Sequence, residues 1–311
     1  MSKNIRLLTL VACCVIALAA CTKPKNTSKA DPDAQQHNSD VSNTKSESDN
    51  LNTDINSILN EVRGKTDGIQ ALSICGATID SSQQNAAIPT IIVNFDGTSA
   101  CGSPARIRQG QIKIELINGT RWSDQGAKLR VTHNDYKVTF VELDNHYLVF
   151  NGVKYLTNVN GFNWIGIYLG TSTATIKERS DNMEVTFENG DTESWNCARL
   201  STWGLQGGQV YAIVNGDSIS NGKTIDSWGT TRFGTNFTTE MITPWKSGTA
   251  CGWWKPTQGK YTSRTDNFTV TATASVDQNG NTVSGCGAYG YKIEWNYANG
   301  TATGDAVIPY F

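Results

Sequence analysis

The sequence lacks the features that define several large classes of protein. It has almost no net charge, with 26 Lys and Arg against 28 Asp and Glu, whereas a protein that coats nucleic acid needs a strong basic excess. Prolines are few, 7 against 29 glycines, and hydrophobic residues make up only 38%. Together with a mean hydropathy of −0.37, this composition excludes a collagen, a multi-span membrane protein and a fully disordered chain. We therefore expect a globular body and no nucleic-acid partner.

Catalytic and metal-binding motifs are also missing. His133 and His146 fall in the part of the chain expected to fold, but no Gly-x-Ser-x-Gly turn accompanies them. No two cysteines have the spacing of a zinc site. Acid pairs such as Glu184 and Glu188 are ordinary on the solvent face of a strand. The sequence predicts no metal and no cofactor, and it favours a protein that is not an enzyme, with a hydrolase as an open alternative.

The first 20 residues have the pattern of an export signal. Lys3 and Arg6 precede an apolar run from Leu7 to Ala20, which is too short to span a bilayer as a helix. The run ends in Leu-Ala-Ala-Cys, which resembles the lipobox of bacterial lipoproteins. That resemblance implies removal of residues 1–20, acylation of Cys21, and a lipid bilayer as partner, since two or more acyl chains anchor a protein stably.

Residues 21–50 are predicted to be the lipidated cysteine followed by a flexible tether. Thr22 to Asn50 contains one valine and no aromatic residue, so this stretch buries too little apolar surface to offset the entropy of ordering it. The beginning of this stretch is basic, and it lacks the acidic cluster that is associated with surface export in some bacterial lipoproteins. We expect a location at the bacterial outer membrane, with the periplasmic face favoured over the cell surface.

A short helix is predicted over residues 51–66. Five apolar residues fall on one helical stripe, and a glycine follows as the stop signal. These residues are Leu51, Ile55, Ile58, Leu59, Val62 and Gly64.

After residue 67 the pattern changes to alternation of apolar and polar residues, which is typical of half-buried strands. Eight Asn-Gly dipeptides interrupt the strands, and Asn-Gly supplies the positive φ angles of tight hairpin turns. Tyr147 to Leu156 is predicted to be such a hairpin, with its turn at Asn151-Gly152. We predict an all-β fold of antiparallel, sandwich-like modules over 67–200 and 201–311, or one domain spanning both.

Five cysteines remain once Cys13 and Cys14 leave with the signal and Cys21 carries lipid. The local pairs are Cys75 with Cys101 and Cys251 with Cys286. In the chain-entropy model, loops of these lengths stabilise by about 3 to 4 kcal/mol each. Cys197 is left as an unpaired thiol, and we expect it to be buried and inert.

One stretch of the body resembles a known family. The residues concerned are Ile91 to Gly97, Cys101, Arg106 to Ile112, Gly126, Asn134-Asp135-Tyr136 and Thr157-Asn158. Over about residues 70–200 they are similar to a group of uncharacterised Bacteroidetes lipoproteins, with departures at Asn94 and Asp96. The resemblance implies an envelope location and a β architecture, and it brings no activity and no site residues.

Aromatic residues carry the one suggestion of a ligand. All nine tryptophans follow residue 121, and flat rings beside Asn, Asp and Thr are what sugar-binding surfaces use for stacking and hydrogen bonding. The candidates are Trp228, Trp245, Trp253 and Trp254. The sequence favours a lipid-anchored, non-catalytic structural or interaction module of the envelope whose partner is unknown, with a glycan or an envelope protein as the candidates. Glycan binding through exposed tryptophans is the first alternative and an envelope hydrolase is the second.

Overall fold

The computed structural model describes residues 32–62, 74–102, 104–143, 145–162, 164–253, 255–298 and 302–310. The predicted signal peptide, Cys21 and Trp254 lie outside these ranges. The helices are α1 (Pro32–Val62), α2 (Trp164–Tyr168) and a single 3-10 turn, η1 (Gly285–Gly287). The strands are β1 (Ala77–Asp80), β2 (Thr90–Cys101), β3 (Arg106–Asn118), β4 (Lys128–Phe140), β5 (His146–Asn158), β6 (Ala174–Phe187), β7 (Thr192–Gln206), β8 (Gln209–Gly216), β9 (Ser218–Ser220), β10 (Lys223–Thr230), β11 (Asn236–Gly248), β12 (Gln258–Thr265), β13 (Phe268–Val276), β14 (Gly290–Tyr297) and β15 (Thr303–Pro309).

All of these strands belong to one antiparallel sheet, which confirms the all-β prediction. Its order is β1-β2-β3-β4-β5-β6-β7-β10-β11-β12-β13-β14-β15, while β8 pairs with β7 and β11, and β9 pairs with β10. The boundary expected near residue 200 falls inside β7, which pairs along its length with β6 and β8. The described strands therefore form one continuous sheet across this expected boundary.

The alternating segments of the sequence are strands in the structure. Residues 112–116 lie in β3, 183–187 in β6, 268–272 in β13 and 291–295 in β14. In β13 the burial alternates strictly from Phe268 to Ala274, because successive side chains point to opposite faces of a sheet. The apolar face is the one that meets α1.

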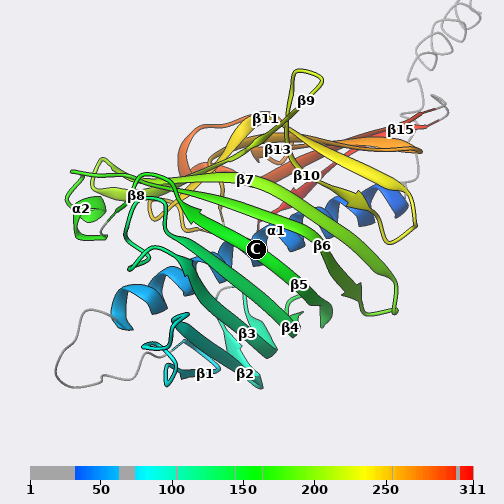
Figure 1. Ribbon diagram of the computed structural model, residues 1–311. Helices are drawn as coiled ribbons and strands as arrows, with labels where there is room; N and C mark the ends of the chain where they lie inside the picture. The colour runs from blue at the N-terminus through cyan, green and yellow to red at the C-terminus, as the bar shows by residue number, and fades with distance from the viewer. Residues whose placement is uncertain are drawn as a thin grey trace, which may run out of the picture.

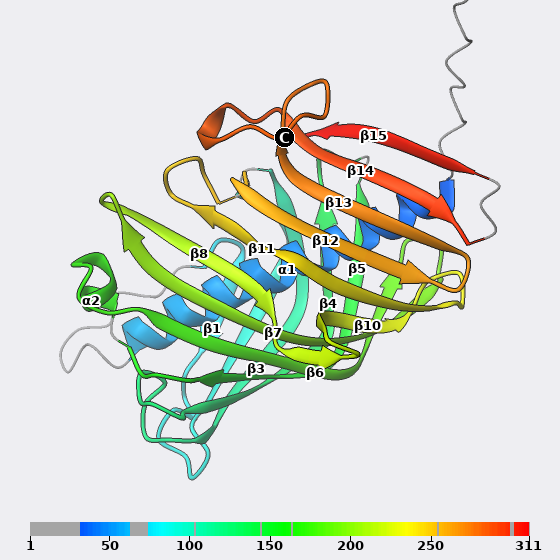
Figure 2. The ribbon, with the colours of Figure 1, turned by 90° about the horizontal axis from the view of Figure 1, so that it is seen from above.

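A row of bulges curves the sheet around α1. Gly110, Asp135, Gly152 and Asn182 have φ angles of +91°, +47°, +132° and +54°. They lie at register shifts in four successive strands, β3 to β6. The strands approach so closely there that a Cβ on Gly110 would lie 2.1 Å from the carbonyl oxygen of Asp135. Because a bulge bends and twists its strand, this row favours the curvature seen in Figures 1 and 2.

The hairpin predicted at Tyr147 to Leu156 is wrong, since β5 runs without a turn from His146 to Asn158. Asn151-Gly152 forms part of the bulge row instead. The Asn151 amide accepts a hydrogen bond from the Asp135 backbone N–H at 2.8 Å and donates one to the Asp135 carboxylate at 3.0 Å. Positive φ at an Asn-Gly pair serves a bulge as well as a turn, and the dipeptide alone does not distinguish them.

The N-terminal helix is longer than predicted. It begins at Pro32, so the expectation of a flexible tether is incorrect for residues 32–50, and the helix does not start at Leu51. Proline is well suited to the first helical turn, where its missing N–H is not needed. The prediction failed because it counted only apolar residues, whereas this segment is ordered by buried polar contacts with the sheet.

The core lies between α1 and the concave face of the single sheet (Figures 1 and 2). α1 contributes Leu51, Ile55 and Ile58, each at most 3% exposed. These side chains belong to one cluster with apolar residues of β2 to β7 and β11 to β14. The helix thus occupies the place that a second sheet has in a sandwich.

Candidate functional site

The four candidate tryptophans do not gather on one surface. Trp245 packs on the concave side, its ring centroid 5.9 Å from that of Tyr261. Trp253 is 41% exposed and lies 5.2 Å from Trp203, centroid to centroid. Trp254 falls outside the described residues. Among the three candidates that the structure describes, Trp228 is the one that lines the open groove over β10 and β11.

Trp228 faces away from α1, on the outer side of the sheet. Its neighbour Ser227 is fully buried and pairs with Thr239. Thr239 donates a hydrogen bond to Ser263, which in turn contacts His37 of α1. Since successive side chains of a strand alternate between faces, Trp228 points outward, where it is half-buried.

A groove of about 480 Å³ surrounds Trp228, which is within the usual size range of small-ligand sites. It crosses β9, β10 and β11. Its lining consists of Ser218, Ser220, Ile225, Trp228, Gly229, Thr230, Asn236, Phe237 and Thr238. The lining therefore combines aromatic and aliphatic surface with hydroxyl and amide groups, and it includes no titratable side chain.

Strand pairing places the polar groups beside the indole. Thr238 is the cross-strand partner of Trp228 on β11, and Asn236 is the partner of Thr230. On the other side Asn196 of β7 pairs with Trp228, and its amide donates a hydrogen bond to the Trp228 carbonyl oxygen at 3.2 Å. The backbone of Trp228 is thus paired with β7 on one side and β11 on the other. The hydrogen-bonding side chains beside its indole lie on the β11 side.

The β9 hairpin forms one wall of the groove. Ser218 to Ser220 pair with Ile225 to Lys223, and the turn uses Asn221 and Gly222 at φ angles of +50° and +74°. This is an Asn-Gly hairpin turn of the predicted kind. The hairpin rises from the sheet above β10 and β11 (Figure 1).

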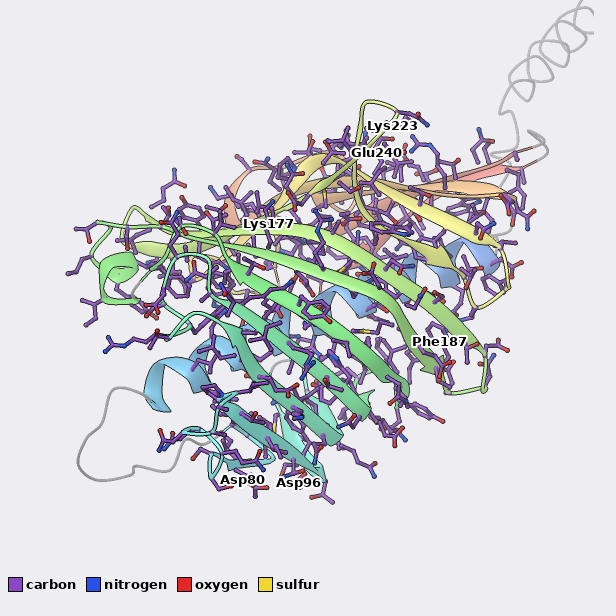
Figure 3. All side chains as sticks on the ribbon, in the orientation of Figure 1. Asp80, Asp96, Lys177, Phe187, Lys223 and Glu240 are labelled. Carbon is purple, nitrogen blue, oxygen red and sulfur yellow. A yellow bond between two sulfur atoms is a disulfide. The ribbon has the colours of Figure 1, made fainter. Side chains whose placement is uncertain are left out.

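Ion pairs hold β10 against β11 and β12 close to the groove. The Glu240 carboxylate lies 2.6 Å from Arg264 Nη1 and 3.3 Å from Lys223 Nζ. Desolvation alone would raise the pKa of Glu240, but the hydrogen bonds and charges of Arg264 and Lys223 together lower that pKa below its ordinary value. Figure 3 shows Lys223 and Glu240 together beside β9. Neither lines the groove.

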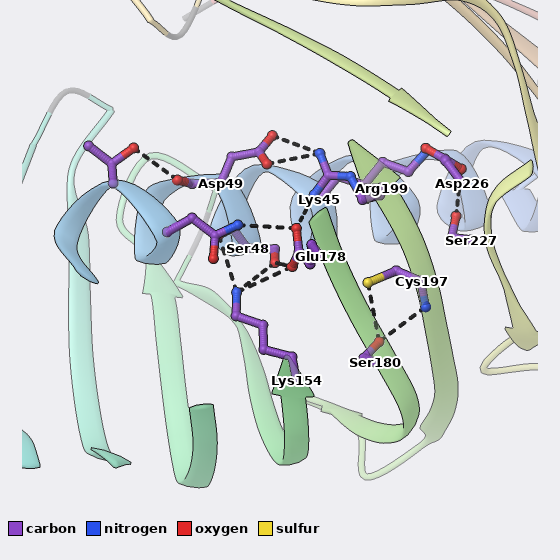
Figure 4. Close-up of polar contacts among 12 residues, drawn as sticks. Lys45, Ser48, Asp49, Lys154, Glu178, Ser180, Cys197, Arg199, Asp226 and Ser227 are labelled. Carbon is purple, nitrogen blue, oxygen red and sulfur yellow. Dashed lines mark hydrogen bonds and ion pairs between the residues drawn. The ribbon is translucent and has the colours of Figure 1, made fainter. Parts of the chain in front are cut away.

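A second cluster of polar residues lies between α1 and the concave face (Figure 4). At its centre, the Glu178 carboxylate accepts hydrogen bonds from Ser48 at 2.5 Å and Asn52 at 3.1 Å on α1. Lys154 and Arg199 donate to it from the neighbouring strands, each at 3.3 Å. Burial alone would raise the pKa of Glu178, but the charges of Lys154 and Arg199 lower it to about 2. Glu178 is therefore a fully paired anion.

This buried cluster has no room for a substrate. The cavity beside it has a volume of about 20 Å³, and a water molecule needs about 10 to 15 Å³. Cys197 lines this cavity, 3.3 Å from the Ser180 hydroxyl. Burial raises the pKa of the Cys197 thiol to about 12, so it is not a nucleophile at neutral pH. The expectation of a buried, unpaired Cys197 is confirmed.

The histidines do not form a catalytic site with the acids beside them in sequence. His133 is buried beneath α1 with Tyr136 and Phe150. His146 pairs with Glu188, 2.8 Å from Nδ1 to the carboxylate. His37, which the sequence reading left outside the folded body, is buried on α1. Within the described ranges, no group of three or more His, Cys, Asp and Glu side chains is arranged to hold a metal ion.

Both predicted cysteine pairs are confirmed. Cys75 and Cys101 have their Cα atoms 5.9 Å apart, and Cys251 and Cys286 have theirs 5.0 Å apart, and each pair forms a disulfide. The first joins the segment before β1 to the end of β2. The second joins Cys251, in the loop after β11, to Cys286 in η1. Cys251 is two residues before Trp253 in the sequence.

Sequence reasoning found Trp228 but missed the side chains around it. Thr230, Thr238 and Asn236 share its face by the alternation of β10 and β11. This shared face can be recognised only when the pairing of β10 with β11 is known. Ser218 and Ser220 come from a three-residue strand, which is too short to show a period.

Comparison with known proteins gives no match: no family model, no curated protein and no solved structure is similar to this chain. Among the helices the structure describes, none combines the length and the apolar character needed to cross a bilayer.

Proposed function

We propose that this chain is a lipid-anchored protein of the bacterial envelope that binds a neutral saccharide in the Trp228 groove and catalyses no reaction on it. The observation that carries the proposal is the groove itself, about 480 Å³ in volume, with an indole beside hydroxyl and amide groups. Indole faces stack on the apolar face of a sugar ring, and neutral hydroxyl and amide groups hydrogen-bond to sugar hydroxyls.

The absence of titratable groups from the lining supports binding over hydrolysis. Glycoside hydrolysis uses two carboxyl groups on either side of the scissile bond, and the residues that line this groove include no carboxyl group. The same observation favours a neutral ligand. A charged ligand would lose its hydration in the groove without meeting a side chain of opposite charge among the lining residues. An interaction module for an envelope protein remains the competing function.

The anchor part of the proposal rests on the lipobox-like end of residues 1–20. In this account Cys21 carries the acyl chains at the outer membrane, facing the periplasm. Residues 22–31 connect it to Pro32, where α1 begins. Even fully extended, these residues span at most about 35 Å. The folded body is therefore held closer to the bilayer than a tether reaching residue 50 would allow.

The test of the binding function is a screen of neutral oligosaccharides and polysaccharides against the chain without its signal peptide and lipidated cysteine, residues 22–311, with intact disulfides. We expect a saturable ligand whose affinity falls at least tenfold in Trp228→Ala. A tenfold loss is about 1.4 kcal/mol, in line with the loss of one aromatic stacking contact.

Trp253→Ala is the matched control, since it removes another exposed indole away from the groove. Retained binding in Trp253→Ala and loss in Trp228→Ala support the proposal. Equal affinity of the two variants for every ligand found, or no ligand at all for the folded chain, contradicts it and favours the protein-interaction function. Mass spectrometry of the mature N-terminus tests the anchor separately, and an unmodified Cys21 contradicts that part.

A further inference from the structure

The buried face of α1 is unusually polar for a helix in a core. Among its described side chains the buried apolar residues are Ala34, Val41, Leu51, Ile55 and Ile58. The buried polar residues are His37, Asn38, Asp40, Thr44, Lys45, Glu47, Asn52 and Asn56. Before Leu51 the contact with the sheet is thus almost entirely polar, and its specificity comes from hydrogen bonds and charges.

Charge pairs follow one another along the helix in a fixed order. Asp40 accepts two hydrogen bonds from Arg232, at 2.8 and 2.7 Å. Lys45 Nζ lies 2.6 Å from the Asp226 carboxylate. The next charge on the helix is that of Glu47, which lies 3.6 Å from Arg106 Nε.

Two further pairs continue the series toward the C-terminal end of α1. Asp49 lies 2.8 Å from Arg199 Nη2, and Asp54 pairs with Arg108. From Asp40 to Asp54 the helix rises about 21 Å. Over that length the charges of the helix run negative, positive, negative, negative, negative, and the sheet carries the opposite charge at each of these five positions.

A polar, charge-paired interface of this kind is more typical of two surfaces that can separate than of a permanent core. Interfaces that form and dissociate are about as polar as ordinary protein surface, whereas permanent cores are apolar. Buried ion pairs contribute little net stability over apolar packing, and in some proteins they determine which partner fits and in what register. The backbone hydrogen bonds of the sheet are made between its own strands, and α1 is not part of that pairing.

We propose that the concave face of the sheet is a helix-receiving groove, which also accepts α1 from a second copy of this chain. A second copy is the partner because its α1 carries the same ordered charges and meets every pair. Exchange of one helix for an identical one is reciprocal and gives a closed two-fold dimer. Residues 63–73 connect α1 to Ile74 and, fully extended, would reach at most about 40 Å.

The first test uses fluorescent peptides of residues 32–62 and the chain of residues 22–311. The two are mixed in urea just below the unfolding transition, diluted and separated by size. We expect the wild-type peptide to co-elute with the chain, and the Asp40→Arg peptide to be taken up at least tenfold less. A Thr53→Arg peptide is the matched control, since Thr53 is exposed on α1, and it should be taken up like wild type.

Equal uptake of the Asp40→Arg and Thr53→Arg peptides, or no uptake of the wild-type peptide, overturns the proposal. The peptide variants leave the chain unchanged, so these outcomes do not depend on whether a mutant chain folds.

The second test exchanges the charges between two chains. In Asp40→Arg and in Arg232→Asp, each chain alone places like charges together, but α1 of the Arg232→Asp chain fits the sheet of the Asp40→Arg chain. After the two are mixed in urea and diluted, light scattering should show a heterodimer that neither variant forms alone. A mixture that stays monomeric, with the melting temperatures of the separate variants, contradicts the exchange.

Discussion

Acid should destabilise this protein through two neutral histidines buried at the interface between α1 and the sheet. His37, on α1, contacts the Ser263 hydroxyl at 2.8 Å. Burial, assisted by the charge of Lys45, lowers the pKa of His37 to about 4. His133, on β4, is buried beside Lys154, and burial and that charge lower the pKa of His133 to about 3.

The sign follows from comparing the folded and unfolded states. Unfolded histidine takes up its proton near pH 6.5, whereas folded His37 and His133 stay neutral until the pH falls to about 4 and about 3. The contribution of the two neutral histidines to the free energy of unfolding is therefore fully present above pH 6.5, and it is lost as the pH falls below that value. At pH 5, which is 1.5 units lower, each costs about 2 kcal/mol, or about 4 kcal/mol together. A whole domain is stable by only about 5 to 15 kcal/mol.

Buried carboxyl groups on the same helix act in the opposite direction. Burial raises the pKa values of Asp40 and Glu47, so these groups favour the folded state as the pH falls. The diagnostic quantity is therefore the difference between wild type and a histidine variant, not the pH curve of either alone. Urea unfolding of wild type, His37→Gln and His133→Gln at pH 7 and pH 5 isolates each histidine.

We expect each variant to lose about 2 kcal/mol less than wild type between pH 7 and pH 5. Thr53→Ala is the control, because Thr53 is exposed on α1 and has no titratable side chain; this variant should lose as much stability as wild type between pH 7 and pH 5. If His37→Gln and His133→Gln lose as much stability as wild type over this range, the histidines are not held neutral and the reasoning fails.

Three further predictions concern the core, the buried cluster and a disulfide. Ile55→Ala, which empties a fully buried site on α1, should cost about 2 to 5 kcal/mol of unfolding free energy in urea, against little change for the exposed Thr53→Ala. Glu178→Ala leaves Lys154 and Arg199 without their shared carboxylate, and we expect calorimetry at neutral pH to report a loss of about 3 to 5 kcal/mol; a melting temperature equal to wild type would contradict the buried cluster. Cys251→Ser opens a loop with a sequence separation of 35 and should cost about 3 to 4 kcal/mol, and reduction of wild type should cost more, because it also opens Cys75–Cys101.

The strands could be predicted from the sequence because alternation is a local signal. Segments such as 268–272 show it within five residues, and neighbouring strands of the sheet are mostly consecutive in the chain. The two disulfides were also predictable, because each pair is local in sequence. Burial of Cys197 followed from its strand-like surroundings.

The extent of α1 and the row of bulges could not be predicted in this way. Residues 32–50 have the composition of a solvated stalk, and only the sheet supplies partners such as Arg232 and Asp226 that order them. Gly152 signals a positive φ, but whether the chain turns back or continues depends on Asp135 in the next strand. Both outcomes depend on contacts between residues far apart in the sequence.

The candidate site, too, could be predicted from the sequence only in part. The sequence named both Trp228 and Trp245 as candidates because both have polar neighbours, but Trp245 packs against the core. An indole can line this groove only if it lies on the outer face of the sheet. The face on which Trp228 lies depends on the bulge between Ile225 and Ser227. A single sequence carries no local signal for that bulge.

The central claim is that a neutral saccharide stacks on Trp228, and fluorine NMR of the chain labelled with 5-fluorotryptophan tests it most directly. The Trp228 resonance is assigned by its absence in Trp228→Phe, and the labelled chain is titrated with the tightest ligand from the saccharide screen. The account predicts that the Trp228 resonance shifts to saturation, while those of Trp245, Trp253 and Trp203 stay in place. A shift confined to Trp253 and Trp203, with Trp228 unmoved at saturation, would contradict it.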